Sequence, residues 1–180
     1  MRRAGLAVLG TAIAVAFTIT LDAQKTTEVH PGKGGSPHVR TEWMVDGANI
    51  SIEYGRPSLK GRSLETVAPY GREWRTGADE ATTLKTDKPL TFGTLTVPAG
   101  TYTLYTVPGE QEWQLVVSKK TGQWGIPYPK GEDLGRTTMK VTKASSPAEQ
   151  LTLDVDDTAQ GGTLSIQWGT TTATVPFTVG

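Results

Sequence analysis

The sequence predicts an all-β protein: an antiparallel β-sandwich of about ten short strands, either jelly-roll-like or Ig-like in its connections. Apolar and polar residues alternate with a period of two in many short runs, as in strands that bury one face. Turn-forming residues separate these runs at close spacing, since the 180-residue chain contains 21 glycines and 11 prolines. No apolar pattern of helical period continues beyond about one turn.

Residues 1–23 have the pattern of a secretory signal peptide. Arg2 and Arg3 precede the apolar run Gly5–Leu21, and the expected cleavage site follows Ala23. An uncleaved anchor helix is the alternative, although a run of about 17 residues is at the short edge of what spans a bilayer. We therefore expect an exported protein, periplasmic or extracellular, with no membrane span after cleavage.

Residues 24–35 are expected to be a flexible linker, and residues 36–180 a single β-sandwich domain. The linker contains lysine, threonine, proline and glycine without apolar periodicity. His30 lies in this segment, where we expect a solvated side chain.

The domain is expected to begin with a β-hairpin over residues 38–54. Apolar and polar residues alternate on both sides of Asp46-Gly47, and both turn positions tolerate positive φ. Gly55-Arg56-Pro57 ends the hairpin, because proline has no amide hydrogen to continue the ladder. Ser63 is a candidate N-cap for one helical turn over Leu64–Ala68.

The rest of the chain alternates between strand patterns and turns. Gly93-Thr94 predicts a second hairpin, and Gly161-Gly162 and Gly169-Thr170 predict turns. Lys119–Arg136 is the longest stretch without alternation, and we expect its aromatic residues to cover the core. Strands are expected over residues 81–86, 90–92, 95–97, 101–107, 113–118, 138–143, 151–155, 164–168 and 172–179.

Composition excludes several classes of function. The chain has 18 basic and 18 acidic residues, so it lacks the basic excess of a typical nucleic-acid-binding protein. It contains no cysteine, which excludes disulfides, thiol catalysis and cysteine-ligated zinc. His30 and His38 are its only histidines, so we expect no multi-histidine metal site, and we predict neither a metal nor a cofactor.

The stretch Tyr70–Ala81 departs from the alternating pattern. It places charges of both signs around Trp74, with Gly71 and Gly77 as flexible positions. Such a loop on a strand scaffold predicts either a functional site or an internal ionic clamp. The candidate site residues are His38, Arg56, Arg62, Tyr70, Arg72, Trp74, Arg75, Asp79, Glu80 and Trp124.

A binding module is the favoured hypothesis for this cluster. Arginine offers a planar fork suited to carboxylate, sulfate or phosphate, and the aromatic rings suit stacking on a sugar or aromatic ligand. The expected partner is thus a small molecule, a saccharide or a component of the cell envelope. The part of it that binds would be an anionic group or a sugar.

Two alternatives remain open. A hydrolase-like enzyme would use Asp79 and Glu80, but adjacent strand residues point to opposite faces, and no nucleophile or metal motif accompanies them. We therefore favour a role without catalysis. A purely structural module would use Arg75 with Asp79 or Glu80 as an internal clamp.

The chain contains the motifs Ser36-Pro37-His38, Gly55-Arg56-Pro57, Lys60-Gly61-Arg62, Pro69-Tyr70-Gly71, Trp74-Arg75-Thr76-Gly77, Pro98-Ala99-Gly100-Thr101-Tyr102 and Gly122-Gln123-Trp124-Gly125. Together they resemble a family of exported bacterial proteins called domain of unknown function family 2911. The resemblance covers residues 36–180, and its most specific part is the block Trp74-Arg75-Thr76-Gly77. It implies export and a β-rich domain, and it implies no activity. Asp79 departs from the pattern, which more often has asparagine there.

Overall fold

A computed structural model describes residues 24–180 of the chain, and the predicted signal peptide lies outside the described residues. The described part forms one antiparallel ten-stranded sheet, with the strand order β1-β2-β3-β4-β7-β8-β9-β10-β5-β6. This confirms the predicted all-β antiparallel class. The elements are β1 (Gln24–His30), β2 (His38–Val45), β3 (Ala48–Gly55), α1 (Leu64–Val67), β4 (Ala78–Thr86), β5 (Leu90–Phe92), β6 (Leu95–Val97), β7 (Gly100–Val107), β8 (Glu112–Ser118), β9 (Asp133–Thr158) and β10 (Gly161–Val179).

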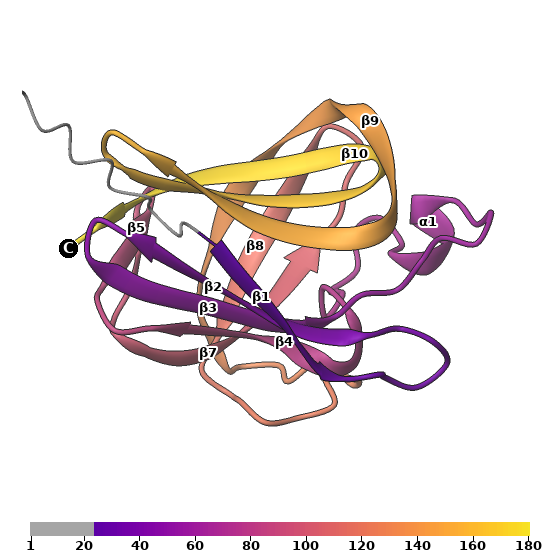
Figure 1. Ribbon diagram of the computed structural model, residues 1–180, viewed down its shortest axis with the longest axis horizontal. Coiled ribbons are helices and arrows are strands. Elements are labelled where there is room, and N and C mark those ends of the chain that lie inside the picture. Colours follow the sequence, from indigo (N-terminus) through magenta and orange to yellow (C-terminus); the bar gives the residue numbers. More distant parts are fainter. Residues whose placement is uncertain (1–23) are drawn as a thin grey trace, which may run out of the picture.

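The sheet folds over on itself into two facing layers. In Figure 1, β9 and β10 form the upper layer, above a lower layer that contains β2, β3, β4 and β7, while β8 pairs with both β7 and β9. Several side-chain hydrogen bonds cross between the layers, and two of them involve large buried aromatic residues. Trp43 Nε1 donates to Asp154 Oδ1 at 3.2 Å, and Leu153 N donates to the Tyr54 hydroxyl at 2.9 Å.

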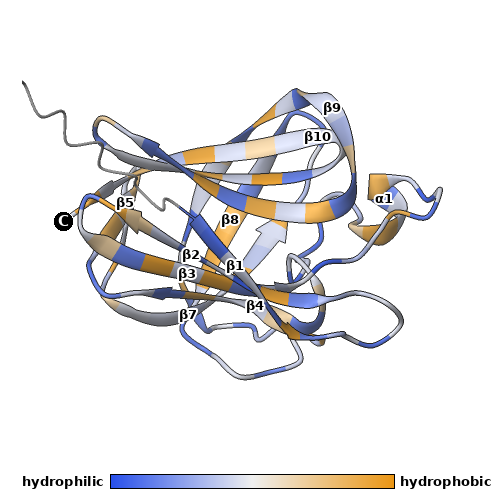
Figure 2. Ribbon diagram, viewed as in Figure 1, coloured by the Kyte–Doolittle hydropathy of each residue, from blue (hydrophilic) through white to orange (hydrophobic). Residues whose placement is uncertain are grey.

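The core lies between these layers because alternate residues of each strand point inward. β2 and β3 show strictly or nearly alternating burial, and Figure 2 shows the matching change between hydrophobic and hydrophilic residues along the strands. Each large apolar side chain that is fully buried contributes about 1.5–3 kcal/mol. The largest buried side chains include Trp113, Tyr54, Tyr105, Phe92, Ile52, Leu84, Leu104 and Leu115.

The predicted local motifs of the first half are confirmed. β2 and β3 pair from His38–Gly55 to Val45–Ala48, and the turn residues Asp46 and Gly47 have φ of 47° and 72°. β5 and β6 form the second hairpin. The helical turn α1 begins at its expected cap, where Ser63 Oγ accepts a hydrogen bond from Thr66 N at 3.3 Å.

Two segments differ from the expectation. Residues 24–30, expected to be part of a linker, form strand β1, which pairs with β2 although its side chains are almost all exposed. Backbone pairing stabilises β1 without apolar burial, so the sequence carries no alternation there.

The second difference concerns the C-terminal strands. The four strands expected after residue 137 belong to only two long strands, β9 and β10. The expected turn at Gly169-Thr170 is a register shift within β10, opposite the segment of β9 that contains Pro147. In the sequence, a glycine at an irregular position within one strand therefore looks the same as a glycine at a turn between two strands.

Candidate functional site

The stretch Tyr70–Ala81 is joined to β7 by backbone pairing. Trp74 and Thr106 exchange two backbone hydrogen bonds, of 2.8 and 2.9 Å. Thr76 is fully buried with φ of 57°, and its hydroxyl lies 3.1 Å from the Thr106 hydroxyl. The stretch is thus an integral part of the fold, and its side chains have defined positions.

A hollow of about 380 Å³ lies between α1 and this stretch. Two of its walls are indole rings: Trp74 stacks on Trp168, with ring centroids 5.6 Å apart and an interplanar angle of 10°. Two arginines, Arg62 and Arg75, also line it, and no acidic residue of the described chain does so. The complete lining is Pro57, Arg62, Thr66, Val67, Trp74, Arg75, Gly77, Ala78, Ile126 and Trp168.

Arg75 is held by the loop that follows β8. Its Nη1 donates to the main-chain oxygen of Trp124 at 3.1 Å, and its guanidinium lies 5.0 Å from the centre of the Trp124 ring. Burial lowers the pKa of Arg75, and the charges of Asp79 and Glu80 oppose that shift. The guanidinium remains a cation at neutral pH, because arginine is effectively always protonated in proteins.

The structure separates the other predicted arginines. Arg62 reaches the hollow while donating through Nε and Nη2 to the main-chain oxygens of Leu59 and Ser58, each at 2.8 Å. Arg56 does not line the hollow; it donates to Leu151 O at 3.1 Å and to Thr152 Oγ1 at 3.0 Å. Arg56 therefore connects the end of β3 to β9.

Three further candidates lie outside the hollow. Tyr70 and Arg72 are exposed and are not part of its lining. Trp124 is 42% exposed and contacts two cations, Arg75 and Lys33, the latter with Nζ 5.2 Å from the ring centre. Of the predicted cluster, Arg62, Trp74 and Arg75 thus come together in the hollow, and Trp124 contacts Arg75 beside it.

The two predicted carboxylates lie on β4 and have different surroundings. Asp79 is 7% exposed, has φ of 60°, and accepts a hydrogen bond from Lys33 N at 2.7 Å. Glu80 is exposed and faces two histidines. Neither carboxylate forms an ion pair with Arg75 within residues 24–180.

An ionic clamp does exist, but around a different arginine. Arg136 on β9 contacts Asp133 Oδ2 at 2.9 Å, Glu73 Oε1 at 3.3 Å and the Tyr128 hydroxyl at 3.0 Å. It connects the Tyr70–Ala81 stretch to β9 and to the loop before it. No sequence signal indicated this, because Glu73 and Arg136 are far apart in the chain.

The histidines form a cluster that the sequence analysis did not predict. His30 and His38 face each other across β1 and β2, with ring centroids 4.6 Å apart and an interplanar angle of 15°. Glu80 Oε2 lies 3.7 Å from His30 Nε2 and 3.6 Å from His38 Nδ1. Burial, followed by the charge of His30, lowers the pKa of His38. Recognition of β1 as a strand would have paired the two histidines.

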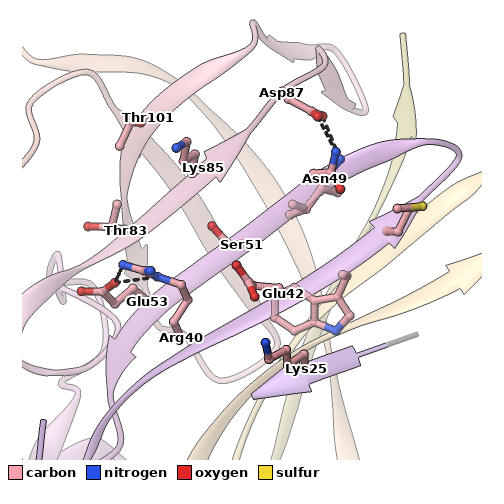
Figure 3. A pocket seen from close by; sticks show the side chains of 13 residues that line it. Lys25, Arg40, Glu42, Asn49, Ser51, Glu53, Thr83, Lys85, Asp87 and Thr101 are labelled. Carbon is pink, nitrogen blue, oxygen red and sulfur yellow. Dashed lines mark hydrogen bonds and ion pairs between the residues drawn. The ribbon is translucent and has the colours of Figure 1, made fainter. Parts of the chain in front are cut away.

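A wider groove of about 740 Å³ lies over the outer face of β1–β4 and β7 (Figure 3). Three of its charged lining residues form hydrogen bonds within the groove: Arg40 Nε donates to Glu53 Oε2 at 2.9 Å, and Asn49 Nδ2 donates to Asp87 Oδ2 at 2.6 Å. These hydrogen bonds from Asn49 lower the pKa of Asp87. Three basic residues match three acidic ones, so the groove has no net charge to select a ligand. Those six are Lys25, Arg40, Lys85, Glu42, Glu53 and Asp87.

Comparison with known proteins gives one family. A family model described as "Protein of unknown function (DUF2911)" matches residues 36–177. No curated protein and no solved structure matches the chain. Within residues 24–180, no helix has the length and apolar character needed to cross a bilayer.

Proposed function

We propose that this chain, which belongs to the DUF2911 family, is an exported binding module for a small anionic ligand with an apolar ring or chain. The ligand would bind in the hollow between α1 and the Tyr70–Ala81 stretch. The observation that carries the proposal is the lining of this hollow, where two arginines accompany the stacked pair Trp74 and Trp168.

Charge supports an anion. Arg62 and Arg75 line the hollow, and no acidic residue of the described chain belongs to its lining. Each guanidinium has some of its N–H groups bonded to main-chain oxygens, which fixes its position. Arginine recognises carboxylate and phosphate groups by paired, charge-assisted hydrogen bonds.

Shape and polarity indicate the rest of the ligand. A volume of about 380 Å³ is at the small end of the range for ligand pockets. The lining also includes the apolar side chains of Val67 and Ile126. A planar ring would stack on the partly exposed indole of Trp74, since such stacking adds about 0.5–1.5 kcal/mol beyond burial.

The test is ligand titration followed by tryptophan fluorescence. An acidic monosaccharide such as a uronic acid, and an aryl carboxylate such as phenylacetate, are each compared with the neutral sugar or amide of the same shape. Arg75→Met and Arg62→Met should weaken binding of the acids at least about tenfold, since a hydrogen bond to a charged group contributes about 1.5–3 kcal/mol. Arg72→Met is the matched control, because Arg72 is exposed and lies outside the hollow. Equal binding of the neutral analogues, or equal losses in all three variants, would refute the proposal.

Export is supported by the signal-peptide pattern of residues 1–23. N-terminal sequencing of the protein recovered from the periplasm or medium should begin at Gln24. Recovery of the uncleaved chain with the membrane fraction would support the anchor-helix alternative instead.

A further inference from the structure

Three potential metal ligands from three strands meet at one end of the lower layer. His30 is the last residue of β1, His38 is the first residue of β2, and Glu80 lies near the start of β4. One potential ligand atom from each of the three residues lies within 4.8 Å of those of the other two. This cluster is separate from the lining of the hollow proposed above to bind an anion, and it does not depend on that proposal.

His38 supplies an independent observation. The residue is 2% exposed, and its buried Nδ1 has no hydrogen-bond partner in the described part of the chain. This nitrogen points to Glu80 Oε2 at 3.6 Å, which is too long for a hydrogen bond. A buried ring nitrogen without a partner is unfavourable, and a metal ion between the imidazole and the carboxylate would satisfy it.

We propose that His30, His38 and Glu80 bind a divalent transition-metal ion, with Zn²⁺ as the best match. Two imidazole nitrogens and one carboxylate oxygen are a donor set that binds zinc in proteins and leaves a fourth position for water or another ligand. In tetrahedral zinc sites with bonds of this kind, neighbouring donors are about 3.3 Å apart. The two histidine–glutamate separations, 3.6 and 3.7 Å, are close to that distance.

Binding requires a small movement of His30. The two imidazoles must move closer and tilt out of their stack, and His30 is the residue able to do so, because its side chain is 41% exposed at the end of edge strand β1. Its Nδ1 accepts a hydrogen bond from Gly32 N at 3.1 Å. Ligation through Nε2 places the ring proton on Nδ1, so Gly32 N must turn away. Gly32 has φ of 71°, a conformation that glycine adopts readily.

The charges around the cluster favour a cation. Besides Glu80, Asp79 on β4 and Glu53 on β3 place negative charge near His38. Within the described cluster, the ring that faces His38 is that of His30.

Zinc titration of the mature protein, without a histidine-containing tag, tests this site. Calorimetry should give one Zn²⁺ per chain, and Co²⁺ should give the visible absorption of a site with nitrogen and oxygen ligands. Glu80→Gln and His38→Gln should each weaken binding at least about tenfold, because even outer-shell partners of a metal site contribute 10–100-fold. Glu42→Gln is the control, since Glu42 is an exposed acid on β2 in the outer groove.

Thermal stability gives a second readout. Zn²⁺ should raise the melting temperature of the parent and the control but not that of Glu80→Gln. If His38→Gln fails to fold, His30→Gln and Glu80→Gln still decide the question, because both side chains are substantially exposed. Absence of saturable Zn²⁺ binding, or binding that is unchanged in Glu80→Gln and His30→Gln, would overturn the proposal.

Discussion

Replacement of Tyr54 by phenylalanine should measure how strongly the two layers are joined. The Tyr54 hydroxyl, from β3, accepts a hydrogen bond from Leu153 N of β9 at 2.9 Å, and both residues are buried. Burial raises the pKa of Tyr54, so the hydroxyl stays neutral at physiological pH. Phenylalanine fills nearly the same volume but leaves Leu153 N buried without an acceptor. Such an unpaired group costs about 1–3 kcal/mol.

Urea unfolding followed by tryptophan fluorescence is the appropriate assay. For a domain with an m-value of about 2 kcal/mol/M, a loss of about 2 kcal/mol lowers the midpoint by about 1 M without changing m. Tyr102→Phe is the matched control, because Tyr102 is partly buried against the core but makes no hydrogen bond through its hydroxyl to residues 24–180. A loss below about 0.5 kcal/mol for Tyr54→Phe, or equal losses for both variants, would show that this hydrogen bond does not hold the layers together.

Three other changes test separate parts of the fold. Gly55→Ala should lower the unfolding free energy by at least about 2 kcal/mol, because its Cβ would lie 2.2 Å from a main-chain oxygen of β4. Gly61→Ala is the control, because its Cβ would have no atom within 4 Å and only the strain of a φ of 76° would lower its stability. Equal losses of stability for Gly55→Ala and Gly61→Ala in thermal unfolding would contradict this reasoning. Arg40→Met should cost less than about 1 kcal/mol in urea unfolding, and the difference should shrink in high salt, because its ion pair is exposed. Burial, followed by the hydrogen bond and charge of Asp133, raises the pKa of Tyr128 to about 12. Protonated Tyr128 therefore contributes fully to the stability of the fold below about pH 10, and this contribution is lost as the pH rises towards 12. Tyr128→Phe should remove a phenolate absorbance that appears near pH 12 in an alkaline titration, and an unchanged titration would refute this.

The sequence was sufficient where side-chain alternation and turn chemistry are local. The hairpin around Asp46-Gly47 and the cap at Ser63 were predicted because neighbouring residues determine them. Strand β1 was not predicted, since its residues are polar and exposed and its pairing partner comes later in the chain. For the same reason the pairing of His30 with His38 was invisible from composition alone.

The candidate site was only partly predictable. Arg62, Trp74 and Arg75 meet in one hollow, as clustering in the sequence suggested, but Trp168 of that hollow reads in the sequence as an ordinary core residue of an alternating strand. Arg56 belongs to the same sequence cluster, yet it bonds β9. Proximity in the sequence could not distinguish Arg56, which connects the layers, from Arg62 and Arg75, which line the hollow.

One irregularity in the ladder explains how β4 positions both carboxylates. The register between β3 and β4 shifts between Glu53 and Gly55, where Gly55 lies directly against Ala78. Asp79 follows with φ of 60°, a conformation that costs a non-glycine residue about 1–3 kcal/mol. Its 2.7 Å hydrogen bond from Lys33 N offsets that cost and holds the loop between β1 and β2. Because the backbone turns there, Asp79 contacts this loop while Glu80 faces the histidines at the two ends of the same loop. The strain at Asp79 and the position of Glu80 are therefore linked, and a residue that relaxed φ at position 79 would also move the carboxylate proposed to bind the metal.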